Sequence, residues 1–278
     1  MTDEQYAPPA PPSPNGRPAA EDPLAADLAL AVELVRGAGD LAAEMLAGGL
    51  RTHHKSSVSD VVSAADHAAE ELVAGRLRAA RPADGIVGEE GAAVPGDRTW
   101  FIDPVDGTYN FLAGLPFWCS ALALAERTES GWAPLLGAVY HPAANELWAG
   151  SRTAPATRNG QPLPPLADRP LAEVSLSSYL HPAALGDPDV REPTLAAMTG
   201  AATVRMLGSG SVELAAVAGG RLGAYLHRDT LDWDWLPGAA LVTAAGGRVE
   251  VFGHRGHRWH LAGSARAVGD LRQRILAV

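Results

Sequence analysis

Two short apolar segments of the sequence run directly into acidic residues. Residues 86–88 (Ile-Val-Gly) precede the pair Glu89-Glu90, and residues 99–102 (Thr-Trp-Phe-Ile) precede Asp103. Short apolar runs of this kind are typical of buried strands. Alone, the Glu-Glu pair would fit a solvated turn, but neighbouring carboxylates repel one another and require a cation or strong solvation. Two acidic strand ends therefore predict a sheet that delivers carboxylates to a metal at one edge.

The segment at residues 103–108 carries the most specific pattern in the chain. Its sequence is Asp-Pro-Val-Asp-Gly-Thr, and Pro104 disfavours helix at the residue before it. We expect a turn after Asp103, so that the carboxylates of Asp103 and Asp106 and the carbonyl of Val105 point to one place. Three oxygen ligands within four residues suit Mg²⁺. Two ordinary surface turns could contain these dipeptides, but their position between a buried strand and a helix favours a metal site.

Gly107 and Thr108 open the helix that is expected after this motif. The first backbone N–H groups of a helix have no partner within it, and the positive end of the helix dipole lies beside them. Phosphate groups bind at such positions for both reasons. The motif therefore predicts a phosphate site next to a magnesium site.

A third acidic segment lies at residues 231–238, before an alanine-rich stretch. We predict that Asp234 lies at the N-terminal end of a helix that begins near Pro237, with this proline in the first turn. An aspartate at such a position is often only a helix cap, and the segment alone leaves that alternative open. Asp232 is interpreted as a polar residue of the preceding loop.

The first half of the chain is expected to contain two helices followed by antiparallel strands. Apolar residues recur at helical spacing over residues 24–46, and residues 51–60 form a polar loop. A second helix is predicted from near Ala64 to Leu77, with Asp66 in its first turn. Strands are predicted at residues 86–88, 99–102, 119–125, 135–140 and 146–149, with an Asn-Gly hairpin turn at residues 159–160.

The second half alternates strands and helices, which favours an α/β layered fold. The predicted strands are residues 174–178, 204–207, 223–226 and 248–251, and the predicted helices are residues 194–198, 211–218 and 237–245.

The length of 278 residues allows one large domain or two closely packed halves. Residues 1–22 are rich in proline and poor in large apolar side chains, so we predict a disordered tail. We divide the remainder into an N-terminal half, 23–155, which carries most metal ligands, and a C-terminal half, 156–278, which carries Asp234 and the substrate pocket. The boundary falls in a segment rich in proline and polar residues, 153–170.

Composition excludes several classes of function. The formal net charge of −10 argues against general binding to nucleic acids or anionic membranes, because both are polyanions. We find no apolar run long enough to cross a bilayer and no signal sequence, so a cytoplasmic location is expected. The single cysteine, Cys119, lies between apolar residues and is interpreted as an unreactive core thiol.

The chain resembles the inositol monophosphatase family of magnesium-dependent, lithium-sensitive phosphatases. The resemblance rests on the order and separation of three segments: Glu89-Glu90, residues 103–111 and Trp233-Asp234. The resemblance covers residues 24–278, and the supporting matches are Lys55-Ser56-Ser57, Asp66, Arg158-Asn159-Gly160, residues 207–210 and residues 243–247. It implies a layered αβαβα sandwich of the sugar-phosphatase type, usually assembled as a homodimer.

The resemblance also implies a role for each matching residue. Two or three Mg²⁺ ions would be bound by Glu89, Asp103, the Val105 carbonyl, Asp106 and Asp234. The attacking water would be activated by the pair Asp66 and Thr108, with Glu89 and Asp103 also counted as catalytic. The substrate would contact Asp106, Asp234, the amides of Gly107 and Thr108, and an alcohol pocket formed by Gly208, Ser209, Gly210 and His227.

His227 departs from the family pattern in a way that bears on the substrate. It lies seven residues before Asp234, where inositol-specific relatives carry an acidic residue. A neutral histidine can hydrogen-bond a hydroxyl, whereas a protonated histidine beside Arg228 would favour a second anionic group. A loop histidine that faces water is an equal alternative.

The expected reaction is hydrolysis of a phosphate monoester of a small polyol or sugar, by direct attack of metal-activated water and without a phosphoenzyme. The substrate alternatives are fructose 1,6-bisphosphate, histidinol phosphate, a 3′-phosphonucleotide or a pathway-specific sugar phosphate. An alternative from a different class is a regulatory protein that keeps this fold without catalysis.

Overall fold

The computed structural model describes residues 22–49 and 58–278, so nearly all of the predicted tail and most of the predicted loop at 51–60 lie outside it. The helices are α1 (Ala25–Gly49), α2 (Val58–Ala80), α3 (Thr108–Leu112), α4 (Pro188–Met198), α5 (Gly210–Ala218), α6 (Asp232–Ala244) and α7 (Ala265–Leu276). The strands are β1 (Gly85–Gly88), β2 (Ala93–Val94), β3 (Arg98–Asp106), β4 (Cys119–Thr128), β5 (Gly131–His141), β6 (Glu146–Ser151), β7 (Thr157–Arg158), β8 (Gln161–Pro162), β9 (Ser175–Ser178), β10 (Thr203–Arg205), β11 (Ala224–Arg228), β12 (Arg248–His254) and β13 (His257–Gly263).

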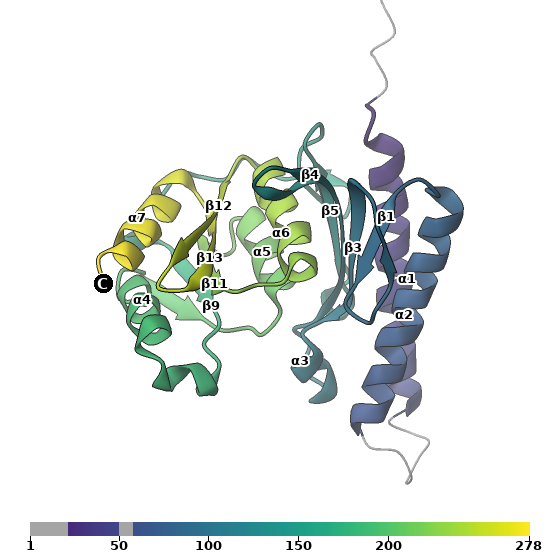
Figure 1. The fold of residues 1–278 in the computed structure, drawn as a ribbon, viewed down its shortest axis with the longest axis horizontal. Helices are drawn as coiled ribbons and strands as arrows, with labels where there is room; N and C mark the ends of the chain where they lie inside the picture. The colour runs from purple at the N-terminus through teal and green to yellow at the C-terminus, as the bar shows by residue number, and fades with distance from the viewer. Residues whose placement is uncertain (1–21, 50–57) are drawn as a thin grey trace, which may run out of the picture.

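The strands form two sheets that are separated and covered by helices. The first sheet has the order β2-β1-β3-β4-β5-β6-β7-β8, and the second has the order β10-β9-β11-β13-β12. Helices α1 and α2 cover the outer face of the first sheet, α5 and α6 lie between the sheets, and α4 and α7 cover the outer face of the second (Figure 1). This arrangement confirms the predicted αβαβα sandwich.

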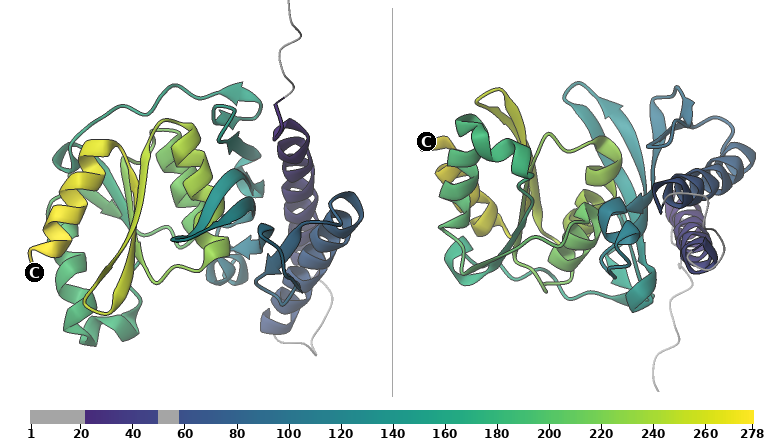
Figure 2. Two further views of the ribbon diagram at one scale, coloured as in Figure 1. Left: turned by 45° about the horizontal axis from the view of Figure 1, so that its top comes forward. Right: turned by 90° about the horizontal axis from the view of Figure 1, so that it is seen from below.

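The chain crosses once from the first sheet to the second. The crossing runs from β8 to β9 and overlaps the segment at 153–170 that was predicted as a boundary. In Figure 2 this segment passes as a long strap from one sheet to the other. Among the residues that the structure describes, no helix is long and apolar enough to span a membrane.

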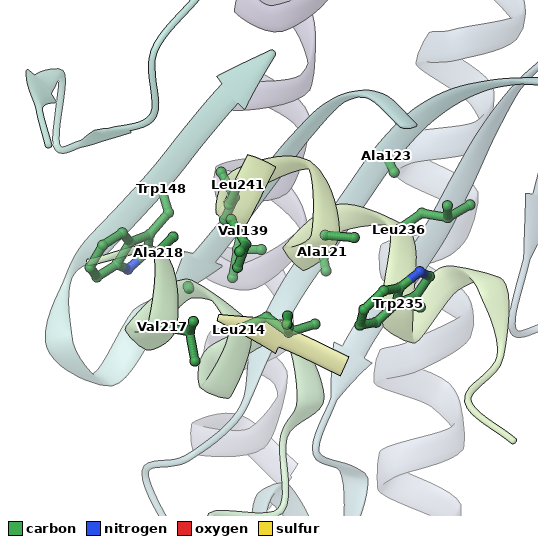
Figure 3. Close-up of a cluster of buried hydrophobic side chains, with 14 of the residues drawn as sticks. Ala121, Ala123, Val139, Trp148, Leu214, Val217, Ala218, Trp235, Leu236 and Leu241 are labelled. Atoms are coloured by element: carbon green, nitrogen blue, oxygen red, sulfur yellow. The ribbon is translucent and has the colours of Figure 1, made fainter. Parts of the chain in front are cut away.

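The core between the first sheet and the α5–α6 layer combines large side chains with very small ones. Leu214 of α5 and Leu241 of α6 pack against Val139 and Trp148 of the sheet (Figure 3). The helix backbone approaches the sheet closely because the facing strand residue is glycine: a Cβ built on Gly137 would lie 2.2 Å from the Pro237 carbonyl oxygen. Cys119 is fully buried in this core, as predicted.

Helix α2 begins earlier than predicted. It starts at Val58 rather than near Ala64, so Asp66 lies in the third turn and not in the first. The start was predicted too late because serine, valine and aspartate are weaker helix formers than alanine. The difference is only about 0.7 kcal/mol per residue. Helix α2 packs against α1, and tertiary packing in general outweighs propensity differences of this size.

The predicted turn after Asp103 is wrong, because β3 continues through Pro104 to Asp106. The register shifts there: Asp103 lies opposite Ala121, and Asp106 lies opposite Cys119. Such a β-bulge places an extra residue on one strand, and proline is tolerated in it because a ladder hydrogen bond is already missing.

Other boundaries also differ from the sequence prediction. Helix α4 begins at Pro188 rather than at residue 194, and β10 ends at Arg205. Helix α6 begins at Asp232, so this residue belongs to the helix rather than to the preceding loop, and Pro237 lies in its interior. The sequence prediction contained no element after residue 251, where the structure has β13 and α7.

Candidate active site

The bulge in β3 turns Asp103 and Asp106 toward the same side of the sheet. In a regular strand, residues three apart point to opposite faces. Here the partner residues Ala121 and Cys119 are two apart and face the α5–α6 layer, so both aspartates face that layer as well. Both side chains are buried. The bulge therefore achieves what the predicted turn was expected to do.

Glu89 and Asp234 approach this pair from two further elements. Strand β1 runs parallel to β3, and the N–H of Glu89 donates to the Ile102 carbonyl at 3.2 Å, which places Glu89 beside Asp103. Asp234 comes from the first turn of α6. One carboxylate oxygen from each of Asp103, Asp106 and Asp234 lies within 4.8 Å of the others.

Burial makes this cluster of carboxylates hard to ionise. Desolvation, followed by repulsion from Asp234, raises the pKa of Glu89 to about 7 and that of Asp106 to about 7. Desolvation, followed by repulsion from Asp106, raises the pKa of Asp103 well above its usual range. A bound cation would reverse both effects, because it compensates the buried charge.

The donor atoms of the site fit a hard divalent cation. Oδ1 of Asp103 and Oδ1 of Asp66 are buried and have no hydrogen-bond partner within the described ranges. A buried polar atom without a partner is strongly unfavourable, so a ligand for these oxygens is expected. Because all the converging donors are oxygens, Mg²⁺ fits the set better than a metal that prefers nitrogen or sulfur.

Asp106 also receives hydrogen bonds from the second half of the chain. The backbone N–H groups of Gly210 and Ser211, at the N-terminus of α5, donate to its two carboxylate oxygens. Asp106 thus joins the bulged strand of the first sheet to a helix that lies between the sheets.

Asp66 and Thr108 are predicted as a catalytic pair, but only Thr108 lines the cavity. The Thr108 hydroxyl donates to the Val105 carbonyl at 3.3 Å, an oxygen that was predicted to bind metal. Asp66 is buried on α2, and desolvation, together with repulsion from Glu90 and then Glu89, raises its pKa to about 7. The role of this pair in activating water stays a prediction.

A cavity with a volume of about 510 Å³ opens above the carboxylates. Every residue predicted for the site lines this cavity except Asp66. The sequence prediction missed several further lining residues, which come from four separate segments of the chain: Tyr109, Asn110, Tyr179, His181, Met206, Leu207, Glu213, Tyr225 and Thr230.

Comparison with known proteins identifies the architecture. The model of the "Inositol monophosphatase family" matches residues 24–274. The chain belongs to this family. It is therefore a phosphatase, a metal-binding hydrolase of phosphate monoesters, and phosphatases of this family depend on magnesium in general.

Three relatives place this phosphatase within the family. It is 34% identical over 194 residues to an inositol-1-monophosphatase of Rhizobium meliloti, covering 68% of this chain and 71% of that protein. It is 50% identical over 88 residues to a histidinol-phosphatase of Streptomyces coelicolor, covering 31% and 33% of the two chains. The structure of an inositol monophosphatase from Anabaena superposes with a TM-score of 0.78 at 27% identity, covering 92% of this chain and 97% of that one.

His227 of this phosphatase lies in a stack of three rings. Its imidazole is nearly parallel to the Tyr225 ring and to the Tyr179 ring, with centroids 5.7 Å apart and interplanar angles of 14° and 9°. Desolvation lowers the pKa of His227 to about 4, so the ring is neutral near pH 7. His227 therefore forms part of the cavity wall, and the alternative of a protonated anion-binding histidine is not favoured.

Glu70 holds part of the site in place, although the sequence prediction did not include it. Its buried carboxylate accepts the N–H groups of Glu90 and Ala92, both at 2.8 Å, and so holds the turn that carries Glu89. The available signal was its position four residues after Asp66, which puts both carboxylates on one face of α2.

Proposed function

We propose that this phosphatase hydrolyses a phosphate monoester of a small polyol or sugar by direct attack of water on phosphorus. The bond from the water oxygen to phosphorus forms as the ester bond breaks, the alcohol leaves with a proton, and no phosphoenzyme forms. The observation that carries the proposal is the convergence of Asp103, Asp106 and Asp234 at a cavity with a volume of about 510 Å³, in a chain of this family.

The proposed metal site is formed by Glu89, Asp103, the Val105 carbonyl, Asp106 and Asp234. When bound there, two or three Mg²⁺ ions would supply positive charge to the phosphate and to the departing alcohol, and would make water a better nucleophile. The negative charge of the carboxylates alone would repel a phosphate, so the site requires these cations to bind its substrate.

The remaining roles fall to residues around this cluster. We propose that Asp66 and Thr108 orient the attacking water and accept its proton. The amides of Gly107 and Thr108 would hold the phosphate, and the alcohol would lie against Gly208, Ser209, Gly210 and His227, all of which line the cavity.

A second candidate substrate has specific support. Tyr179, the exposed outer ring of the stack with His227 and Tyr225, lines the cavity, and planar heterocycles bind aromatic rings by offset stacking. The locally similar relative is named for the phosphate ester of histidinol, an alcohol that carries an imidazole ring. Histidinol phosphate is therefore the alternative substrate that we favour.

The proposed assembly is a homodimer in the cytoplasm. The proposal follows from membership of the family, which the resemblance describes as usually homodimeric. Light scattering coupled to gel filtration would test the assembly, and a monomer at micromolar concentration would contradict it.

The deciding experiment is phosphate release from inositol 1-phosphate, histidinol phosphate, fructose 1,6-bisphosphate, adenosine 3′,5′-bisphosphate and β-glycerophosphate, each with Mg²⁺ and with EDTA. We expect release only with Mg²⁺ and one favoured substrate. A preference for inositol 1-phosphate supports the polyol proposal, and a preference for histidinol phosphate supports the second candidate. Release in EDTA, or from no substrate by folded protein, would contradict the proposed function.

A further inference from the structure

The loop of residues 206–209 forms a wall of the cavity where the two halves of the chain meet. A Cβ built on Gly107 would lie 3.1 Å from the Ser209 Cβ and 3.2 Å from the Gly208 carbonyl oxygen. There is no room for a side chain at that position. The 206–209 loop therefore lies directly against the segment that carries the phosphate-binding amides, and a displacement of the loop would alter the cavity.

Glu213 holds the 206–209 loop from within the second half. Its carboxylate lies on α5, is 1% exposed, and accepts the N–H groups of Leu207 at 2.6 Å and Gly208 at 3.2 Å through one oxygen. A carboxylate this deeply buried is unfavourable unless it is hydrogen-bonded. Two N–H groups of the loop donate to this one buried oxygen, so the loop cannot move without leaving a buried acceptor unpaired, which is costly.

Asn110 holds the same loop from the first half. Its side-chain nitrogen donates to the Leu207 carbonyl and to the Phe117 carbonyl, both at 2.7 Å. Leu207 is thus bound on its N–H by Glu213 and on its carbonyl by Asn110. Gly208, with φ of +82°, leaves room for the asparagine, since a Cβ there would lie 2.9 Å from the Asn110 nitrogen.

The loop leads directly into α5, the helix whose first N–H groups donate to Asp106, a proposed metal ligand. Ser209 caps α5, and the next two residues, Gly210 and Ser211, donate their N–H groups to Asp106. The position of the loop consequently sets two features of the site: the wall beside the alcohol and the orientation of the Asp106 carboxylate.

We infer that Glu213 and Asn110 are positioning residues that fix the 206–209 loop, and through it the alcohol wall of the cavity and the carboxylate of Asp106. The part that concerns the alcohol rests on the proposed function. Neither residue is a proposed metal ligand or contacts the reacting atoms; each acts through the loop.

The test compares Glu213→Ala, Glu213→Gln and Asn110→Ala in the full chain. Loss of the two bonds in Glu213→Ala should raise KM for the preferred ester about tenfold. At saturating Mg²⁺, which offsets weaker metal binding through Asp106, kcat should stay within about threefold. The Kd for Mg²⁺ alone, measured by calorimetry, should rise about fivefold through the freed Asp106. Glutamine keeps an acceptor oxygen, so Glu213→Gln should restore both values to within about threefold of wild type.

A matched control separates positioning from general stability. Asp270 on α7 also accepts a backbone N–H, that of Leu171 at 2.9 Å, but it does not line the cavity. Asp270→Ala should lower the melting temperature and leave KM and the Mg²⁺ Kd unchanged. If folded Glu213→Ala behaves like this control, or if Glu213→Gln fails to restore KM, the inference is overturned.

Two further outcomes keep the test decisive. If Glu213→Ala does not fold, Asn110→Ala carries the test with the same expected rise in KM, and an unchanged KM and Mg²⁺ Kd would refute the inference. If the wild type hydrolyses none of the esters, the proposed function fails, whereas the Mg²⁺ Kd still decides whether the loop positions Asp106.

Discussion

Asp103 carries a buried carboxylate oxygen with no hydrogen-bond partner in the described part of the chain. Nothing in the surrounding core gains from its negative charge, which burial and three neighbouring carboxylates make unfavourable. Buried acidic groups with strongly raised pKa values cluster at functional sites, so Asp103 supports the proposed metal site.

Replacing Asp103 with asparagine should therefore remove activity without harming the fold. We expect magnesium-dependent phosphate release to fall by at least about 100-fold, since a charged ligand is lost from the site. The melting temperature in EDTA should not decrease, because the substitution removes a repelling charge. Asp97→Asn, on the exposed turn before β3, is the control. Undiminished turnover of Asp103→Asn would refute the assignment.

His227 is the residue at which we expect substrate preference to be altered. In His227→Glu, the ring stack with Tyr179 is lost and a carboxylate that can accept two hydroxyl hydrogen bonds takes its place. The ratio of kcat/KM for inositol 1-phosphate to that for histidinol phosphate should rise about tenfold, which corresponds to about 1.4 kcal/mol. An unchanged ratio would show that His227 does not contact the alcohol.

At the scale of elements, the site depends on how closely α6 approaches the first sheet. The helix carries Asp234, and its backbone packs against Gly137 of β5 without room for a methyl group. The bulge in β3 brings Asp103 and Asp106 to the same face. Both features position carboxylates by backbone geometry rather than by side-chain contacts.

Gly137→Ala should push α6 away from the sheet. The added Cβ would lie 2.2 Å from the Pro237 carbonyl oxygen, so we expect a loss of about 1–3 kcal/mol in the free energy of unfolding, measured by urea denaturation. The Kd for Mg²⁺ should also rise, because Asp234 moves with the helix. Gly253→Ala on β12, where a Cβ meets nothing within 4 Å, is the matched control. Equal stability of the two variants would contradict the close-packing argument.

For the molecule as a whole, the proposed metal site would couple the two halves. Asp103 and Asp106 belong to the first sheet, whereas Asp234 belongs to a helix of the second half. A cation that binds all three stabilises only the folded state, by about 2.7 kcal/mol at a concentration 100 times its Kd.

The stability of the metal-free protein should fall as pH rises from about 4 to about 7. In the folded state Asp66, Glu89 and Asp106 have pKa values of about 7, whereas in the unfolded chain they ionise near pH 4, so the folded state binds more protons in this interval. The buried His227 and His260, each with a pKa of about 4, act in the opposite direction below about pH 6.5, but the carboxylates outnumber them.

Melting temperatures at pH 5 and pH 8 provide the measurement. In EDTA the protein should melt lower at pH 8 than at pH 5, and Mg²⁺ should restore stability at pH 8, where the carboxylates can ionise and bind it. Asp97→Asn should show the same behaviour as the wild type. A melting temperature in EDTA that rises between pH 5 and pH 8 would contradict the pKa shifts.

Features encoded within a few neighbouring residues could be read directly from the chain. Apolar runs that end in Glu89 and Asp103, the Asp-Pro-x-Asp-Gly-Thr motif and the alternation of strands and helices each depend on local geometry and on hydrophobic patterning. They were sufficient to predict the layered fold, the family and the acidic residues that converge at the cavity, but not the further residues that line it.

Features that depend on contacts between distant residues could not be read in this way. The bulge at Pro104 depends on the pairing of β4 on both sides of it, and the packing of α2 against α1 is a contact between separate elements. Asn110 meets Leu207 across 97 residues of sequence, and the rings of Tyr179 and His227 meet only when β9 and β11 pair. Such contacts leave no local pattern, since their energy arises only when the sheets and helices have assembled.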